Sequence, residues 1–270
     1  MFVDRPDARL FTLSFGQGAQ TLLAVGGWIG SAEVWHDVFG QLPNWRCVSY
    51  EHRGTGASTH ISPISVEAMV EDVFAVMDAQ EIHRCVLAAE SSGAGIALEA
   101  LLRHPERFSG LVICGGSWKR PVPGQYDDFI ARLSKDFDGE LRAFATACVP
   151  EINRESVRRW GYQVLRRASL QSAIELLECR SALTAQDRLD EMHVPALIIH
   201  GSLDVISPPA NAEELAHALP NAELHLMPGL GHVPILTAPD EVAQLIEWRF
   251  GSASARVTAD AQSDAQSIAA

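Results

Sequence analysis

Residues 85–95, which read CVLAAESSGAG, decide the predicted fold. They begin as a continuous apolar run, which is typical of a strand covered on both faces in a parallel sheet. A serine on a sharp turn between such a strand and a helix requires small residues two positions before and two positions after it. Ala89 and Gly93 meet this requirement for Ser91, whereas Glu90 would occupy one of the small positions if Ser92 were used. We therefore select Ser91 as the candidate nucleophile.

Further strand-like runs alternate with helical patterns along the chain. The runs lie at residues 10–15, 21–25, 46–50, 85–89, 110–114, 196–200 and 223–227. Apolar residues at helical spacing predict helices over 66–77, 96–102, 208–219 and 239–250. Ser207 and Pro208 are expected as the N-cap and first residue of the third helix. This alternation predicts an α/β fold, with a mostly parallel central sheet flanked by helices.

One long segment, residues 119–192, contains no strand-like run. Its apolar residues form four amphipathic stripes, over residues 126–137, 141–148, 157–165 and 170–177. We predict a helical cap inserted after the sixth strand, with residues 1–118 and 193–250 forming the core; helices that only cover the sheet are the alternative. Residues 251–270 are rich in Ala and Ser without apolar periodicity, which predicts a disordered tail.

A serine hydroxyl needs a base to become a nucleophile at neutral pH, and the base needs an orienting carboxylate. Asp204 lies in the turn that follows the run at 196–200, and His232 lies in a glycine-rich loop after the run at 223–227. The three residues follow one another in the chain as Ser, Asp and His. This is the order found in folds whose nucleophilic serine lies on a sharp turn between a strand and a helix. Side chains that follow parallel strands meet at the carboxyl edge of the sheet. We expect Ser91, Asp204 and His232 to form a catalytic triad there.

Attack on a carbonyl places negative charge on its oxygen, which two backbone N–H groups usually stabilise. One N–H comes from the residue after the nucleophile, here Ser92. The other is expected from Trp28, within the sequence GGWIG that follows the run at 21–25. An ordinary glycine-rich turn is the alternative, and GGWIG does not match the dinucleotide-binding pattern G-x-G-x-x-G.

The composition excludes several classes of protein. Lys plus Arg number 21 and Asp plus Glu number 34, so the net charge of −13 would repel nucleic acid and anionic membranes. The five cysteines lack the spacing of a zinc site, and the N-terminus lacks the apolar core of a signal peptide, which favours the cytoplasm. No run approaches the ~18 apolar residues of a membrane span. We expect a small-molecule substrate and no metal or other cofactor, and the oligomeric state stays open.

Together these residues resemble the α/β-hydrolase superfamily over about residues 10–250. EHRGTGAS at 51–58 is similar to the family's D-x-R-G-x-G-x-S turn, with Glu51 at the usual Asp position. In this family the sharp turn that carries the serine is called the nucleophile elbow. RHPER at 103–107 resembles the family's segment at the end of the helix after the elbow, and GHVP at 231–234 resembles the segment around the catalytic histidine. The chain departs from the pattern at Ala89, where the first elbow glycine is usual, and at Gly26, where a histidine is frequent.

The resemblance implies a reaction class. A serine at the elbow excludes the dehalogenases and epoxide hydrolases of the family, which need a carboxylate there. It implies an acyl-enzyme formed from an ester, a lactone or a thioester, as in capped esterases and enol-lactonases. A C–C bond hydrolase or lyase on the same triad, or a slow-turnover ligand receptor, are the alternatives. Glu90, beside the nucleophile, is expected either to pair with Arg53 or to be solvated.

Overall fold

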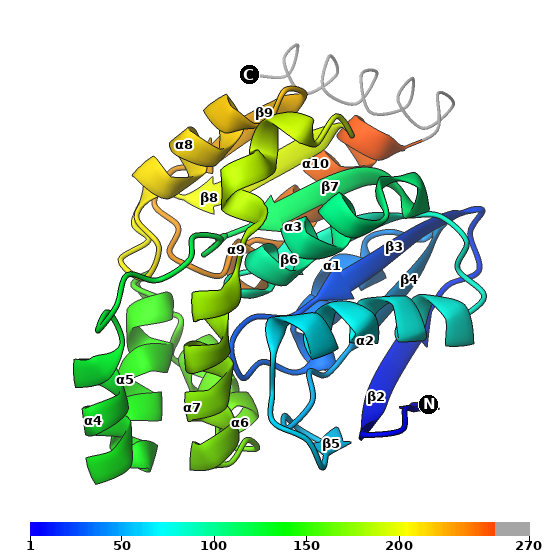
Figure 1. Ribbon diagram of the computed structural model, residues 1–270. Helices are drawn as coiled ribbons and strands as arrows, with labels where there is room; N and C mark the ends of the chain where they lie inside the picture. Colours follow the sequence, from blue (N-terminus) through cyan, green and yellow to red (C-terminus); the bar gives the residue numbers. More distant parts are fainter. Residues whose placement is uncertain (252–270) are drawn as a thin grey trace.

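The computed structural model describes residues 1–251, and the tail predicted to be disordered lies outside these residues apart from Gly251 (Figure 1). The sheet has the order β1-β2-β4-β3-β6-β7-β8-β9, and β5 pairs with β2. Its strands are β1 Phe2–Asp4, β2 Ala8–Phe15, β3 Gln20–Val25, β4 Trp45–Tyr50, β5 Thr59–His60, β6 Cys85–Glu90, β7 Phe108–Cys114, β8 Ala196–Gly201 and β9 Ala222–Met227. The path from β4 to β9 is parallel, whereas β1, β4 and β5 pair with β2 in antiparallel fashion. The predicted mostly parallel sheet is confirmed.

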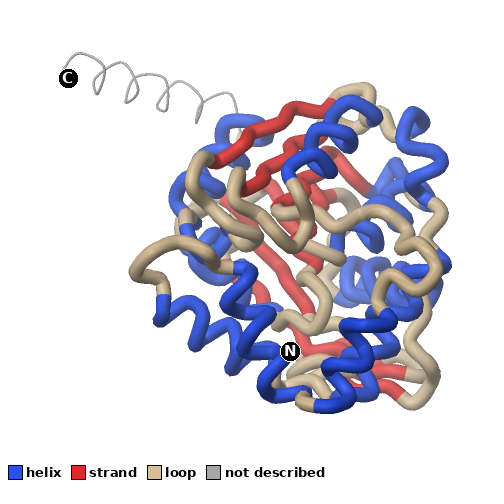
Figure 2. The backbone as a smooth tube through the Cα atoms, turned by 90° about the vertical axis from the view of Figure 1, so that its left-hand side faces the viewer, coloured by secondary structure: helices blue, strands red, loops and turns tan. Residues whose placement is uncertain are grey.

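Two apolar clusters cover the two faces of this sheet. On β7, Leu111 and Ile113 belong to one cluster, and Val112 and Cys114 belong to the other. Helices α2 Val66–Ala79, α3 Gly93–Arg103 and α8 Pro209–Ala218 contribute to the first cluster, and α1 His36–Gly40, α9 Pro234–Thr237 and α10 Pro239–Phe250 to the second. Figure 2 shows the strands as a twisted layer with helices on both sides. Because alternate side chains of each central strand enter different clusters, most positions of these strands are apolar.

Four helices occupy the segment between β7 and β8, where they group together in Figure 1. They are α4 Asp127–Lys135, α5 Phe137–Cys148, α6 Glu155–Leu165 and α7 Leu170–Glu178. The insertion was expected after the sixth strand; β7 is the seventh strand along the chain, or the sixth if the two-residue β5 is not counted. Phe137, assigned from the sequence to the first stripe, instead begins α5, because Asp136 caps that helix by accepting a hydrogen bond from the Gly139 N–H. The division at residues 118 and 193 into core and cap stays a prediction.

The start of α8 differs from the sequence prediction. Pro209, and not Pro208, is the first helical residue, and Pro208 is the N-cap with extended backbone. The cause is the Pro-Pro sequence, since a proline pushes the residue before it out of the helical region. The Ser207 side chain makes no cap and donates instead to the Gly116 carbonyl, 2.8 Å away.

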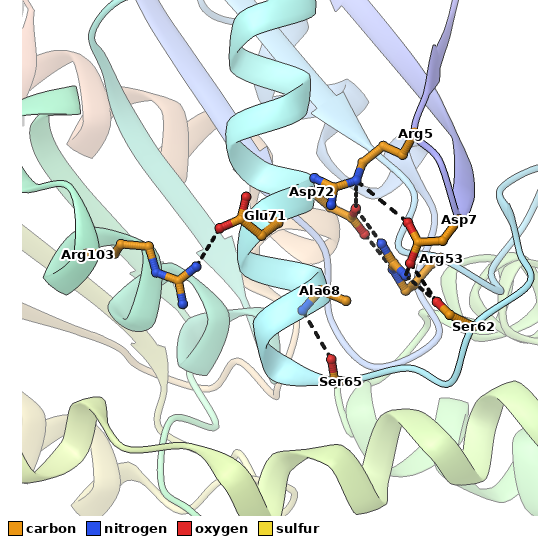
Figure 3. A network of polar contacts seen from close by, with 9 residues as sticks. All are labelled: Arg5, Asp7, Arg53, Ser62, Ser65, Ala68, Glu71, Asp72 and Arg103. Carbon is orange, nitrogen blue, oxygen red and sulfur yellow. Dashed lines mark hydrogen bonds and ion pairs between the residues drawn. The ribbon is translucent and has the colours of Figure 1, made fainter.

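A buried ionic network joins the N-terminal hairpin to the sheet and to α2 (Figure 3). Arg53, which follows β4 and is fully buried, donates from Nε and Nη2 to both oxygens of Asp72 at 2.8 and 2.7 Å. Its Nη1 donates to Asp7, 2.9 Å away, and Ser62 Oγ donates to the same carboxylate at 2.6 Å. Arg5 Nε lies 3.3 Å from Asp72. Two cations thus face two anions, which is the arrangement that makes a buried charge tolerable.

We expect Asp7→Asn to make the free energy of unfolding less dependent on pH. Arg53 and Ser62 lower the pKa of Asp7 from 3.8 to about 2 through their hydrogen bonds. The ionised carboxylate therefore stabilises the fold above about pH 4, and this contribution is lost as the pH falls from about 4 to about 2. At pH 7 the variant should lose about 1 kcal/mol of unfolding free energy. Between pH 4 and 2 its unfolding free energy should fall less steeply than that of the wild type.

Urea unfolding from pH 7 down to pH 2 measures both effects. Asp4→Asn is the matched control, because the Asp4 side chain is exposed and pairs with Arg9 at the surface. Such a surface pair contributes little to stability. If the free energy of unfolding depends on pH equally in Asp7→Asn and in the wild type, protonation of Asp7 does not affect stability, which contradicts the prediction.

Candidate active site

The turn after β6 holds Ser91 in a strained backbone conformation. Ser91 has a φ of 51°, which only a few per cent of residues other than glycine adopt. Its N–H donates to the Cys114 carbonyl at 3.0 Å, and its carbonyl accepts from the Ser117 N–H at 2.9 Å. A side chain at Gly93 would collide with the Gly26 carbonyl oxygen, which is why this position must be glycine. Strand pairing and close packing together force the serine side chain out at the end of the sheet.

The structure brings together the three side chains selected from the sequence. His232 Nε2 lies 2.8 Å from Ser91 Oγ, and His232 Nδ1 lies 2.8 Å from Asp204 Oδ2. The three follow β6, β8 and β9, and all are buried. One imidazole thus faces a hydroxyl on one side and a carboxylate on the other, the geometry that a base and its orienting acid require.

Asp204 is held as a carboxylate by several donors. Its Oδ1 accepts the N–H groups of Ile206 and Ser207 at 2.8 and 2.9 Å, while Oδ2 faces His232. Burial alone would raise the pKa of Asp204, but hydrogen bonds from His200, His232 and the Ser207 backbone outweigh it and hold the pKa well below its usual range. The carboxylate therefore stays charged opposite the imidazole.

His200 is a member of the site that the sequence analysis missed. This fully buried residue places Nε2 at 3.0 Å from Asp204 Oδ2 and at 2.7 Å from the Ser207 carbonyl. It lies within β8, in a run that the sequence marks only as a strand. Its spacing of four residues from Asp204 is the sole sequence signal, and the turn at 201–204 is what converts that spacing into contact.

The loop that carries His232 is held by the inserted helices. The His232 N–H donates to the carbonyl of Cys148, the last residue of α5, at 2.8 Å. The Gly231 N–H donates to Glu151 Oε1 at 2.9 Å. On the core side, Gly115 has a φ of 59°, and a side chain there would collide with the His232 carbonyl oxygen. The position of the imidazole therefore depends on both the sheet and the insertion.

The N–H groups expected to bind an oxyanion have no acceptor in the described part of the chain. The backbone N–H groups of Trp28 and Ser92 make no hydrogen bond within residues 1–251. Trp28 is anchored through its indole N–H, which donates to the Ala173 carbonyl at 2.7 Å. The turn itself is braced by Glu51, whose carboxylate accepts from Ser31 Oγ at 2.9 Å. Trp28, Ser91 and Ser92 line one groove, and within the described residues the two N–H groups have no protein acceptor.

Two cavities meet at Ser91, Trp28 and Phe144. The inner cavity is mostly apolar and is lined by Gly27, Trp28, Ile29, Gly30, Val34, Glu90, Ser91, Phe144, Ala145, Cys148, Val149, Val157, Trp160, Gly161, Val164, Leu165, His232, Val233, Ile235 and Leu236. The outer groove is more polar and is lined by Trp28, Ser91, Ser92, Ser117, Gln125, Tyr126, Phe129, Arg132, Glu140, Ala143, Phe144, Ala147, Leu177, Arg180, Val205 and Ile206. Four aromatic residues of the insertion line these cavities, namely Tyr126, Phe129, Phe144 and Trp160, whereas Phe137 and Tyr162 do not.

Glu90 satisfies neither of the two expectations for it. It is buried, with 7% of its surface exposed, so it is not solvated. Arg53 pairs with Asp7 and Asp72 instead. The carboxyl of Glu90 lines the inner cavity and accepts a hydrogen bond from the Gly27 backbone. Burial raises its pKa, although the nearby His232 and this hydrogen bond oppose the rise.

Within residues 1–251, no cluster of three or more His, Cys, Asp or Glu side chains has an arrangement that could hold a metal ion. No helix in the same range combines the length and the apolar character needed to cross a bilayer.

Comparison with known proteins identifies the family of the chain. The family model of the alpha/beta hydrolase fold matches residues 20–239. The chain belongs to this family, and it is a hydrolase.

Two relatives are similar to the chain in sequence, and a third is similar to it in structure. The chain is 30% identical over 236 residues, covering 83% of the chain and 88% of the relative, to "Putative carbamate hydrolase RutD" of Caulobacter segnis. It is 29% identical over 255 residues, covering 88% and 96%, to the pimeloyl-[acyl-carrier protein] methyl ester esterase of Serratia marcescens. The enol-lactonase of Burkholderia xenovorans LB400 shares the fold with a TM-score of 0.82 at 19% identity, covering 88% of this chain and 95% of that one.

Proposed function

We propose that the protein is a serine hydrolase that cleaves a small carboxylic ester or lactone through an acyl-enzyme. The observation that carries this proposal is the continuous arrangement of Ser91 Oγ, His232 and Asp204, with 2.8 Å at each contact. Ser91 is the proposed nucleophile, His232 the base, and Asp204 the group that orients the base. The N–H groups of Trp28 and Ser92 form the proposed oxyanion hole.

The proposed reaction has two halves. His232 Nε2 accepts the Ser91 hydroxyl proton as Oγ attacks the carbonyl carbon, and the Trp28 and Ser92 N–H groups stabilise the resulting oxyanion. The C–O bond to the leaving group then breaks, and His232 returns its proton to the leaving oxygen. In the second half, His232 takes a proton from water, whose oxygen attacks the acyl carbonyl. Collapse of this second intermediate gives the proton to Ser91 and releases the acid.

The two cavities support an assignment of the two halves of the substrate. The outer groove includes exposed Gln125, Arg132 and Val205, so a leaving group placed there can depart into water. The inner cavity is lined by Trp28, Phe144 and other, mostly buried, apolar residues. We place the acyl group in the inner cavity, where it stays while water replaces the leaving group.

Carbamate hydrolysis is a second candidate. The 30% identity to the Caulobacter segnis protein favours it, and a carbamate carbonyl can be attacked by the same serine. For either reaction we propose a small-molecule substrate and no nucleic-acid or membrane partner, on the strength of the net charge of −13. We also propose a cytoplasmic location, because all five cysteines are free, as is usual in a reducing compartment.

A substrate panel combined with active-site labelling tests the proposal. The panel contains p-nitrophenyl acetate and butyrate, a γ-lactone, p-nitrophenyl carbamate and a vinylogous diketone as a C–C bond substrate. We expect turnover of the short esters or the lactone, and labelling of Ser91 by a fluorophosphonate, located by peptide mass spectrometry. Cleavage of the diketone alone would favour a C–C bond hydrolase. Binding of a ligand with negligible turnover of every compound would favour a receptor.

A further inference from the structure

Glu90 is a buried carboxyl group that the proposed mechanism does not use. It is the last residue of β6, directly before Ser91, and it lines the inner cavity together with His232. Within residues 1–251 it has no ion-pair partner, and the Gly27 N–H is its one hydrogen-bond donor. A carboxylate can accept about four hydrogen bonds, so most of this capacity is unused.

Such a group is costly to the fold. Burying a carboxyl with one hydrogen bond destabilises a protein, whereas an apolar side chain would suit the apolar wall of the inner cavity. A structural role as a brace for the turn at Gly27 and Trp28 accounts for part of its position, because a Cβ at Gly27 would lie 2.5 Å from Glu90 Oε2. Glu90 Oε2 thus lies close to the backbone of Gly27, and the Glu90 side chain also lines the inner cavity. Perturbed carboxyl groups in clefts are typical of functional sites.

We propose that Glu90 is a specificity-determining residue that accepts a hydrogen bond from the acyl group of the substrate. The substrate class is then an ester or lactone whose acyl chain carries a hydroxyl, amine or amide N–H on the carbon atoms nearest the carbonyl. The inference rests on the proposed function, since it places the acyl group in the inner cavity. It narrows the substrate from acyl groups in general to acyl groups with a hydrogen-bond donor.

Two pairs of isosteric esters test the inference. The first pair is p-nitrophenyl 2-hydroxypropanoate and p-nitrophenyl isobutyrate; the second is p-nitrophenyl 3-hydroxybutanoate and p-nitrophenyl isovalerate. Within each pair a hydroxyl replaces a methyl group, so the ratio of their kcat/KM values isolates the hydrogen bond. We expect the wild type to prefer the hydroxy ester in at least one pair. Glu90→Met should lower that ratio at least tenfold, whereas Glu90→Gln, whose amide oxygen still accepts, should keep most of it.

The controls separate this role from a structural one. Glu213→Gln, at an exposed position of α8, should leave both ratios unchanged. If Glu90 only braces the turn, Glu90→Met will slow both members of a pair equally, and the unchanged ratio overturns the inference. A wild-type preference for the methyl member of both pairs overturns it without any variant, even if Glu90→Met does not fold. Absence of ester turnover and of Ser91 labelling in the wild type would instead overturn the proposed function itself.

Discussion

Ser91→Ala is expected to lower kcat for ester hydrolysis by roughly 10⁴- to 10⁶-fold, the range seen when a serine nucleophile is removed. The change deletes the single atom that would form the acyl-enzyme, and it leaves His232 with no proton to accept from the chain. The turn should persist, because it is held by backbone hydrogen bonds to Cys114 and Ser117 and by the close approach at Gly93. Steady-state kinetics measure the loss, and circular dichroism and thermal unfolding check the fold.

A second serine provides the control. Ser109 lies on β7 with its side chain exposed, and its side chain makes no hydrogen bond within residues 1–251. Ser109→Ala should retain wild-type turnover and fluorophosphonate labelling, whereas Ser91→Ala should lose both. Activity of Ser91→Ala within tenfold of the wild type would contradict the assignment of the nucleophile.

Asp204→Asn is expected to lower kcat by roughly 10³- to 10⁴-fold through the wrong imidazole tautomer. The Ile206 and Ser207 N–H groups both point at Oδ1, so the amide oxygen must take this place, because an amide nitrogen cannot accept them. The amide nitrogen then faces His232 Nδ1 and donates to it. The remaining proton of the neutral imidazole moves to Nε2, where it blocks acceptance of the Ser91 proton.

Kinetics and labelling together test this argument. The rate of Ser91 labelling by a fluorophosphonate should fall in parallel with kcat, while the free energy of unfolding changes far less. Asp190→Asn, at an exposed aspartate in the segment before β8, is the control and should behave like the wild type. Retention of at least a tenth of wild-type kcat in Asp204→Asn would show that the carboxylate does not set the tautomer.

The sheet and the three clustered side chains could be predicted because their signals are local. The continuous apolar runs at β3, β6, β7 and β8 follow from burial on both faces, and each of Ser91, Asp204 and His232 occupies a turn directly after a strand. Chain order and turn position were sufficient to expect them at one edge. The sequence already required a small residue at position 93, two residues after Ser91. The structure gives the reason, because a side chain there would collide with the Gly26 carbonyl oxygen.

The remaining features depend on contacts between distant segments. The partner of Arg53 could not be read from the sequence, because Asp7 and Asp72 come from opposite sides of it along the chain. The contact of His200 with Asp204 depends on how the turn after β8 folds back. The strands β1 and β5 are three and two residues long, too short for any periodicity to mark them. The aromatic residues of the insertion carry the same helical spacing whether they fill a core or line a cavity.

The hydrogen bonds between the insertion and the histidine loop constrain the engineering of new enzymes from this scaffold. The segment between β7 and β8 leaves and rejoins the sheet at neighbouring strands, so it is an obvious unit to exchange between hydrolases. A chimera made at these borders would also remove the Cys148 carbonyl and the Glu151 carboxylate that hold the N–H groups of His232 and Gly231. A transplanted segment would have to supply acceptors at both places. Selectivity and catalytic geometry are therefore inherited together, and a graft intended to change the first alters the second.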